Sequence, residues 1–276
     1  MNVFGVLRNG RMRTRLIMRP ALVLMVCFLA VTGKDKKQIA DSDNLVLFSF
    51  DDHWLPFQEN LQLTLERPTK YAGNPVMRGG SPNAPDGFGS LLYGTVLHEN
   101  GKFRMWYIAS PRIDRSIPGD AQRMRSYRPI AYAESQDGIH WEKPNLNLVD
   151  FRGNKNNNLI QIEPSADPLS RPYDFVAVLR DEHDPDPARR YKMAYIVTHP
   201  VWNCSSTVTA VSADGLRWKL VNSVPITEGS YQNSGLIFFN NKYYVSGQTI
   251  LYPPKGTFPE GTPSGRIMTV FESPDF

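Results

Sequence analysis

The stretch Ser135-Gln136-Asp137-Gly138-Ile139-His140-Trp141 indicates the fold, because it recurs further along the chain. Ser212-Ala213-Asp214-Gly215-Leu216-Arg217-Trp218 keeps Ser, Asp, Gly and Trp at the same spacing, and Ser273-Pro274-Asp275-Phe276 begins a third copy. The serines at 135, 212 and 273 lie 77 and 61 residues apart. A motif that returns over distances longer than one hairpin is typical of a repeated supersecondary unit.

Each copy of this motif has the chemistry of a tight turn. Asp-Gly suits a hairpin because Gly accepts a positive φ and Asp tolerates one. The Ser and Asp oxygens can accept nearby backbone N–H groups, and the Trp can fold back as an apolar plug. We therefore assign Asp137 and Asp214 to turns and not to chemistry.

Two runs of apolar, β-branched and aromatic residues precede each turn. The nearer runs cover residues 129–133, 207–211 and 267–271, and the farther runs cover 103–108, 191–197 and 243–246. The unit is thus strand, connection, strand, Asp-Gly turn, strand, which is most of a four-stranded propeller blade. A generic β-sandwich is the alternative, but it does not require the same turn at the same place in successive units.

Further strands are predicted next to turn signals. Residues 91–97 lead through Asn100-Gly101 into the run at 103–108, as a hairpin should. The second unit is predicted to start near 174–179, and the third near 235–239 with a turn at Asn240-Asn241.

The composition agrees with an all-β chain. Among 276 residues, 20 are Gly, 22 are Pro and 11% are aromatic, which fits many short strands and turns. No long segment after the amino terminus has the 3.6-residue apolar period of a helix. The sequence stops inside the third copy of the motif, so we expect a propeller domain over 45–276 that is incomplete at its carboxyl end and needs at least one more blade.

The amino terminus has the pattern of an export signal. Residues 1–33 hold five arginines and no acid, and an apolar run follows from Ala21 to Val31. A basic region before a short apolar run predicts a secretory signal peptide, with a signal-anchor as the alternative. Residues 34–44 are polar and charged, which predicts a flexible lead-in.

Removal of this signal peptide changes the net charge of the chain. Taking its five arginines from the 31 basic residues leaves 26 against 27 acids, a formal net charge of −1. The basic character therefore belongs to the signal and does not indicate a nucleic-acid partner. Only Cys204 remains among the two cysteines, so no disulfide is expected within the mature chain. Export to a bacterial periplasm or to the medium fits these features.

Three segments resemble a known group of enzymes. Residues 70–76, the hairpin at 93–107 and the segment 132–144 are similar to the five-bladed β-propeller glycosidase superfamily. That superfamily includes glycoside hydrolase family 32, with the invertases and levanases, and the arabinanases. The resemblance runs from about residue 45 to the end, and it implies a carbohydrate substrate, hydrolysis of glycosidic bonds and no cofactor.

The resemblance also implies three acids that converge near the propeller axis. Asp86 corresponds to the nucleophile or general base, Asp174 to the transition-state stabiliser and Glu228 to the general acid. Glycosidic cleavage needs one protonated and one ionised carboxyl group on either side of the bond. Acids gathered in a closed pocket divide these roles because their pKa values move apart.

The third acid departs from the family pattern. Glu228 stands several residues further from the next strand than the resemblance implies, and Gln232 and Asn233 occupy the closer positions. We assign these two residues, with Asn74 of the Asn-Pro segment, to substrate binding. If Gln232 replaces the acid, the protein is a propeller that binds carbohydrate without cleaving it. A propeller that binds other proteins is the third functional class.

Other polar groups have a structural interpretation. Three acids alternate with prolines at 181–187, which favours a solvated turn over a calcium loop: Asp181, Asp184 and Asp186. Three loop cations are expected to be solvated, with contact to an anionic sugar as the alternative: Arg123, Arg125 and Arg128. The spacing of the five histidines does not match that of metal ligands. Trp106 is expected in the core. The sequence does not indicate an oligomeric state.

Overall fold

The computed structural model describes most of the chain after residue 65. The described residues are 59–60, 64, 66–125, 127–199, 201, 204–227, 230–251 and 265–276. The chain divides into two units, Met1–Pro68 and Thr69–Phe276, and every helix and strand named below belongs to the second. The predicted signal peptide, the lead-in and Glu228 lie outside the described residues. None of the helices within them is long and apolar enough to span a membrane.

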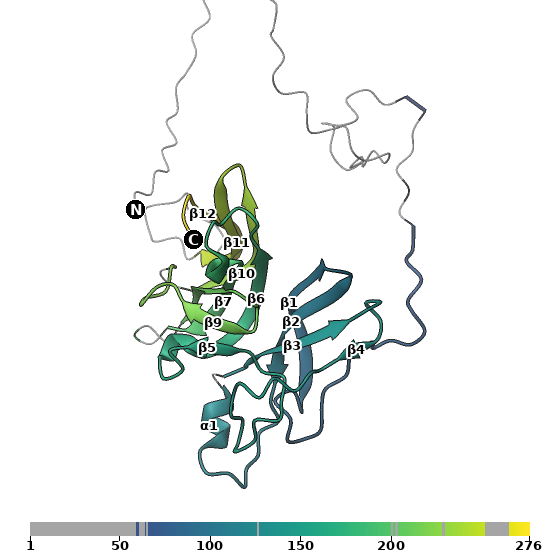
Figure 1. Cartoon of the computed structure of the whole chain (residues 1–276), viewed down its shortest axis with the longest axis vertical. Coiled ribbons are helices and arrows are strands. Elements are labelled where there is room, and N and C mark those ends of the chain that lie inside the picture. Colours follow the sequence, from purple (N-terminus) through teal and green to yellow (C-terminus); the bar gives the residue numbers. More distant parts are fainter. Residues whose placement is uncertain are drawn as a thin grey trace, which may run out of the picture. The chain divides into compact units, whose positions relative to one another are not determined.

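The first sheet, blade 1, is a four-stranded antiparallel meander (Figure 1). Its strands, in spatial order, are β1 (Gly89–Glu99), β2 (Lys102–Ser110), β3 (Ile130–Ser135) and β4 (Trp141–Glu142). Asn100 and Gly101 have φ values of 52° and 73°, so they form the predicted turn between β1 and β2. The short helix α1 (Asp120–Arg125) lies in the connection between β2 and β3.

The second sheet, blade 2, repeats this order. Its antiparallel strands are β6 (Pro172–Arg180), β7 (Tyr191–Thr198), β8 (Ser205–Ser212) and β9 (Arg217–Leu220). A fifth strand, β5 (Gln161–Glu163), pairs with β9 in parallel at the outer edge. Two 3-10 turns flank β6: η1 (Pro168–Ser170) and η2 (Pro187–Arg189).

The third sheet, blade 3, has three antiparallel strands in the described residues. These are β10 (Tyr231–Phe239), β11 (Lys242–Leu251) and β12 (Gly265–Ser273). Asn240 and Asn241 have φ values of 51° and 59°, which confirms the predicted turn.

The first strands of the three sheets are neighbours. Strand β6 contacts β1 on one side and β10 on the other. The Thr95 hydroxyl of β1 accepts the Val178 N–H at 3.0 Å, and the Tyr93 and Phe175 rings stack with 4.5 Å between their centroids. Successive sheets that meet through their first strands form a β-propeller, so the all-β propeller prediction is confirmed. The described residues contain three blades, and a total of five stays a prediction.

The recurring turn has the same geometry in each complete copy. The glycine N–H donates to the serine Oγ at 2.9 Å in both. The indole N–H folds back to the carbonyl of that glycine, at 3.0 Å in the first copy and 2.9 Å in the second. In the third copy the Asp275 N–H donates to Ser273 Oγ at 3.2 Å, which is also the distance in the other two. The motif therefore marks equivalent corners of the three blades.

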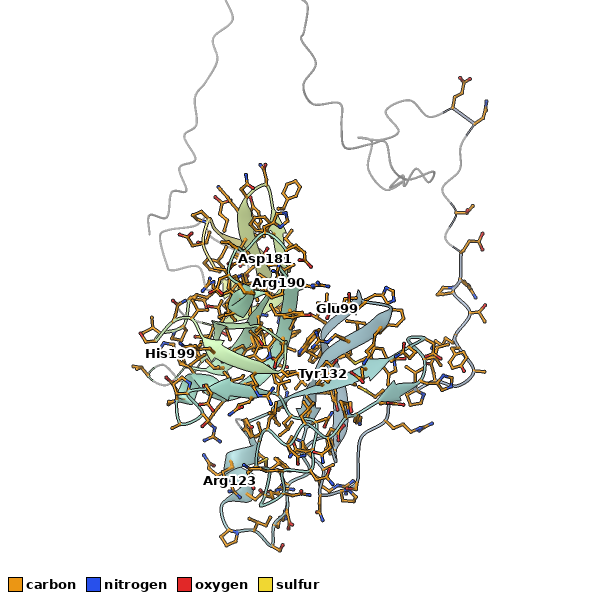
Figure 2. All side chains as sticks on the ribbon, viewed as in Figure 1. Glu99, Arg123, Tyr132, Asp181, Arg190 and His199 are labelled. Atoms are coloured by element: carbon orange, nitrogen blue, oxygen red, sulfur yellow. The ribbon has the colours of Figure 1, made fainter. Side chains whose placement is uncertain are left out.

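A polar group at the end of β1 fastens blade 1 to blade 2 (Figure 2). Glu99 is 8% exposed and accepts hydrogen bonds from Arg104 at 2.6 Å and from the Tyr191 hydroxyl at 2.8 Å. Arg104 donates onward to the carbonyl of Asp214 at 2.6 Å, within the turn motif of blade 2. Trp106 is fully buried, as predicted, and its indole donates to the neighbouring glycine carbonyl at 2.7 Å. We call this group the first latch.

A second latch joins blades 2 and 3 in the same way. Asp181 is 1% exposed and accepts the Tyr243 hydroxyl at 2.5 Å, and the fully buried ammonium of Lys192 lies 3.5 Å from its carboxylate. Asp184 also pairs with Lys192, and Arg189 donates to the carbonyl of Phe276 at 2.6 Å. The predicted solvated turn is therefore wrong for Asp181 and Asp184, because both carboxylates neutralise a buried cation.

Candidate active site

The predicted site residues lie where the first strands of the blades begin. Asp86 precedes β1 by three residues, Asp174 lies in the first part of β6, and Gln232 and Asn233 lie in the first part of β10. The contacts between β1 and β6 advance in the same direction along both strands, from Tyr93 with Phe175 to Thr95 with Val178. The two strands therefore run the same way, and their beginnings lie at the same end of the sheets.

Asp86 is held by donors on several sides. It is 2% exposed, and its carboxylate accepts the Gly80 N–H at 3.0 Å, the Ser90 hydroxyl at 2.9 Å and the Tyr107 hydroxyl at 3.0 Å. It also forms an ion pair with Lys143, the residue after β4. Such a carboxylate is fixed in position and fully hydrogen-bonded.

The surroundings of Asp86 keep it ionised. Burial alone would raise its pKa, but the hydrogen bond and the charge of Lys143, together with the Ser90 and Tyr107 hydroxyls, bring the pKa below its usual value. Burial and the nearby Asp86 charge raise the pKa of the Tyr107 phenol, so it stays a donor. Sequence reasoning missed Lys143, since 57 residues separate it from Asp86 and no local pattern connects them.

A polar cavity of about 250 Å³ opens beside Asp86. Asparagines supply much of its wall: Asn83, Asn145, Asn154, Asn156, Asn157 and Asn158. Primary amides both donate and accept hydrogen bonds, which matches the hydroxyl groups of a sugar. Lys143 also lines this cavity, whereas Asp174 does not.

Asp174 lies at an irregular point of β6. The pairing between β6 and β7 shifts register on both sides of it, and Phe175 has a φ of 35°. A positive φ is unusual for a bulky residue and stores strain, which is common at functional sites. Asp174 is 9% exposed, and its carboxylate accepts the Phe175 N–H at 3.1 Å.

The pKa of Asp174 shifts in the opposite direction to that of Asp86. Burial raises its pKa above the usual value, against the lowering effects of the Phe175 N–H and of Arg128. The Arg128 guanidinium lies 4.0 Å from the carboxylate and stacks over the Tyr173 ring at 5.2 Å. Arg128 was expected to be a solvated loop cation; its side chain keeps 35% of its exposure, and the loop before β3 also places its guanidinium beside the start of β6.

The residues at the start of β10 connect blades. Asn233 is fully buried, donates to the Ala194 carbonyl of β7 at 3.2 Å and accepts from the Thr207 hydroxyl of β8 at 3.4 Å. The half-buried Gln232 accepts from the Gln248 amide on β11 at 2.8 Å. The structure thus places Asn233 within a blade interface, where its amide holds β10 against blade 2.

The remaining predicted site residues are Glu228 and Asn74. Glu228 is outside the described residues. Thr227 is 2% exposed, and its hydroxyl oxygen accepts the Thr207 N–H of β8 at 2.9 Å. Asn74 is exposed in a turn, where its N–H donates to the Tyr71 carbonyl at 3.1 Å.

Comparison with known protein families gives no family model that matches the sequence. An uncharacterised protein of Mycobacterium tuberculosis is 31% identical over 138 residues, which cover 47% of this chain and 34% of that protein. The chain therefore spans about a third of the length of the curated relative that it matches.

Solved structures with similar parts include carbohydrate-active enzymes. A family 117 glycoside hydrolase of Zobellia galactanivorans is 16% identical with a TM-score of 0.42, over 72% of this chain and 57% of that one. An N-acetylgalactosamine deacetylase of F. plautii is 11% identical with a TM-score of 0.40, over 58% and 40%. A family 32 β-fructofuranosidase of Bombyx mori is 11% identical with a TM-score of 0.39, over 63% and 33%. The β-propeller assignment comes from the three sheets and the contacts between their first strands.

Proposed function

We propose that this chain belongs to a secreted β-propeller protein that cleaves glycosidic bonds with carboxylates at the beginnings of its first strands. One observation carries the proposal: Asp86 and Asp174 precede or begin neighbouring strands, and their surroundings move their pKa values in opposite directions. Cleavage of a glycosidic bond needs several carboxyl groups around the bond, and their surroundings give them different pKa values.

In this proposal Asp86 is the base or nucleophile, because Lys143 keeps its carboxylate ionised. Asp174, in its ionised form, stabilises the positive charge of the transition state, and its burial strengthens this electrostatic interaction. Glu228 donates the proton to the leaving group. The asparagine-lined cavity beside Asp86 supplies amides that can bind sugar hydroxyls.

The second candidate function is carbohydrate binding without cleavage. Asp86 is 2% exposed and accepts several hydrogen bonds, which leaves little of its carboxylate for a substrate. An amide stands at Gln232, close to the place where the resemblance implies an acid. Both features favour a pocket that recognises sugars but does not react with them.

Hydrolysis assays separate the two candidates. Wild-type protein and the variants Asp86→Asn, Asp174→Asn and Glu142→Gln are tested on a panel of aryl glycosides and fructans. We expect turnover of at least one substrate, a loss of 100-fold or more in kcat for Asp174→Asn, and no change for Glu142→Gln, an exposed acid on β4. Sugar binding without turnover on every substrate supports the second candidate. Full activity in both aspartate variants removes the site assignment.

Secretion forms part of the proposal and is tested separately. The five arginines and the apolar run within residues 1–33 support it. Amino-terminal sequencing of protein from the growth medium or the periplasm should give a mature end near residues 30–34. A chain that stays in the membrane with its first residues intact would support a signal-anchor instead.

A further inference from the structure

A second cavity, larger than the one beside Asp86, is lined by residues of blades 1 and 2 and of the chain between them. It has a volume of about 520 Å³ and includes neither Asp86 nor Asp174. Its wall comes from the segment before β3, the loop after β4, strand β5 and the start of β6, and it includes Tyr127, Lys155 and Arg171. Cavities of this size commonly hold a small ligand.

The lining of this cavity has an aliphatic part, which we call its floor, and a polar part. Ile130, Ile160 and Ile162 are 1%, 5% and 6% exposed, so they form a fixed apolar surface. Ser165 and Ser170 add hydroxyl groups to the wall; the Ser170 hydroxyl donates to the Pro164 carbonyl at 2.7 Å, so its oxygen remains as an acceptor. An apolar surface beside a few hydrogen-bonding groups suits one sugar ring, which has a C–H face and a hydroxyl edge.

Two cations line the cavity without an acidic partner. Lys155 and Arg171 are exposed, and neither forms an ion pair within the part of the chain that the structure describes. Arg171 stacks over the Tyr127 ring at 5.3 Å, which holds the guanidinium at the wall. The one acid in the lining, Asp150, accepts the Gly153 N–H at 2.9 Å.

The neighbouring chain segments fix this wall. Arg128 stacks over Tyr173 while Arg171 stacks over Tyr127, so the two segments exchange cation–π contacts. The Arg128 N–H also donates to the Pro172 carbonyl at 3.0 Å. A cation held by its neighbours loses little conformational entropy when it binds an anion.

We propose that this cavity binds a sugar unit that carries a carboxylate, that is, a hexuronate. The ring lies on the isoleucine floor beside Tyr127, its hydroxyls meet Ser165 and Ser170, and its carboxylate is bound by Lys155 and Arg171. A guanidinium can bind a carboxylate through two parallel hydrogen bonds, and an ammonium adds a point charge. This binding does not require hydrolysis, so the inference stands apart from the proposed cleavage.

Calorimetric titration of the full-length protein tests the ligand class with three probes. Trigalacturonate carries the ring and the charge, its methyl ester carries the ring alone, and sodium sulfate supplies charge without a ring. We expect trigalacturonate to bind at least tenfold more tightly than either of the others, with an affinity that falls as salt rises. Equal binding of the ester would contradict the role of charge, and equal binding of sulfate would contradict a sugar site.

Matched variants test the location of the site. Lys155→Met and Arg171→Met should each weaken trigalacturonate binding about tenfold or more, whereas Lys219→Met, which removes an exposed cation from β9, should not. Thermal unfolding midpoints confirm that the variants are folded. Asp174→Asn should keep full uronate affinity, which separates this site from the proposed cleavage site. Wild-type affinity in both cavity variants would place the ligand elsewhere and overturn the inference.

Discussion

At the scale of single residues, Asp86 and Asp174 show how two identical side chains obtain different chemistry. Lys143 and three other donors surround Asp86, whereas Asp174 has one backbone donor and an arginine 4.0 Å away. Burial acts on both carboxylates, and the number of partners decides the direction of the pKa shift. This contrast leads to opposite expectations for stability.

Asp86→Asn should destabilise the fold. The change removes the anion that pairs with Lys143 and costs about 2–3 kcal/mol in the free energy of unfolding at pH 7. Because the folded pKa of Asp86 lies below its unfolded value, the wild-type stabilisation is complete above about pH 4 and is lost as the pH falls through the folded pKa. Urea unfolding between pH 2 and 7 measures both effects. An equal free energy for variant and wild type at pH 7 would show that the pair contributes nothing.

Asp174→Asn should have the opposite effect on stability. The folded pKa of Asp174 is raised, so the wild type loses stability as the pH rises from about 4 through that value. The amide cannot ionise, and the variant should therefore be more stable than the wild type at pH 7 and similar to it at pH 3. The same urea titration checks this, and a variant less stable than the wild type at pH 7 would mean that the Phe175 N–H and Arg128 stabilise the ionised carboxylate by more than burial destabilises it.

At the scale of elements, the turn motif has two copies with different neighbours. Gly138 and Gly215 have φ values of 74° and 77°, so alanine at either position costs about 1–2 kcal/mol. A Cβ at Gly215 would also lie 2.8 Å from the Trp106 ring, whereas at Gly138 the nearest atom, on Phe103, is 3.6 Å away. Gly215→Ala should therefore lower the thermal midpoint more than Gly138→Ala. Equal effects would mean that the first latch does not hold Trp106 against this turn.

The latches give a second paired prediction. Tyr191 and Tyr243 each lie opposite the serine of their own turn motif, and each hydroxyl donates to a buried acid of the preceding blade. Tyr191→Phe and Tyr243→Phe should each cost about 1.5–3 kcal/mol of unfolding free energy, as expected for a bond to a charged group. Tyr71→Phe, at an exposed tyrosine, is the control and should be neutral.

Local patterns in the sequence predicted the turns well but not the latches. The Asp-Gly motif and Asn100-Gly101 depend on backbone preferences over a few residues, so the local sequence is enough to predict them. The pairing of Glu99 with Arg104 and Tyr191 depends on how one sheet docks against the next. Asp181 was placed in solvent for the same reason, since its partners Lys192 and Tyr243 come from two different blades.

At the scale of the whole molecule, the three sheets repeat one plan of first-strand contacts and corner turns (Figure 1). Sequence analysis predicted the propeller because the corner motif recurs, and it predicted Asp86 and Asp174 through resemblance. It could not predict Lys143 or the contact of Arg128 with Asp174, since both arise from long connections that return to a strand start.

We propose that sugars bind where the first strands of the three blades begin. A crystal structure of the full-length Asp174→Asn protein with the oligosaccharide that the hydrolysis panel selects tests this most directly. We expect a sugar ring within hydrogen-bonding distance of residue 174 or of the asparagine-lined cavity beside Asp86. An oligosaccharide bound only at the opposite ends of these strands, near Glu99 and Asp181, would contradict it.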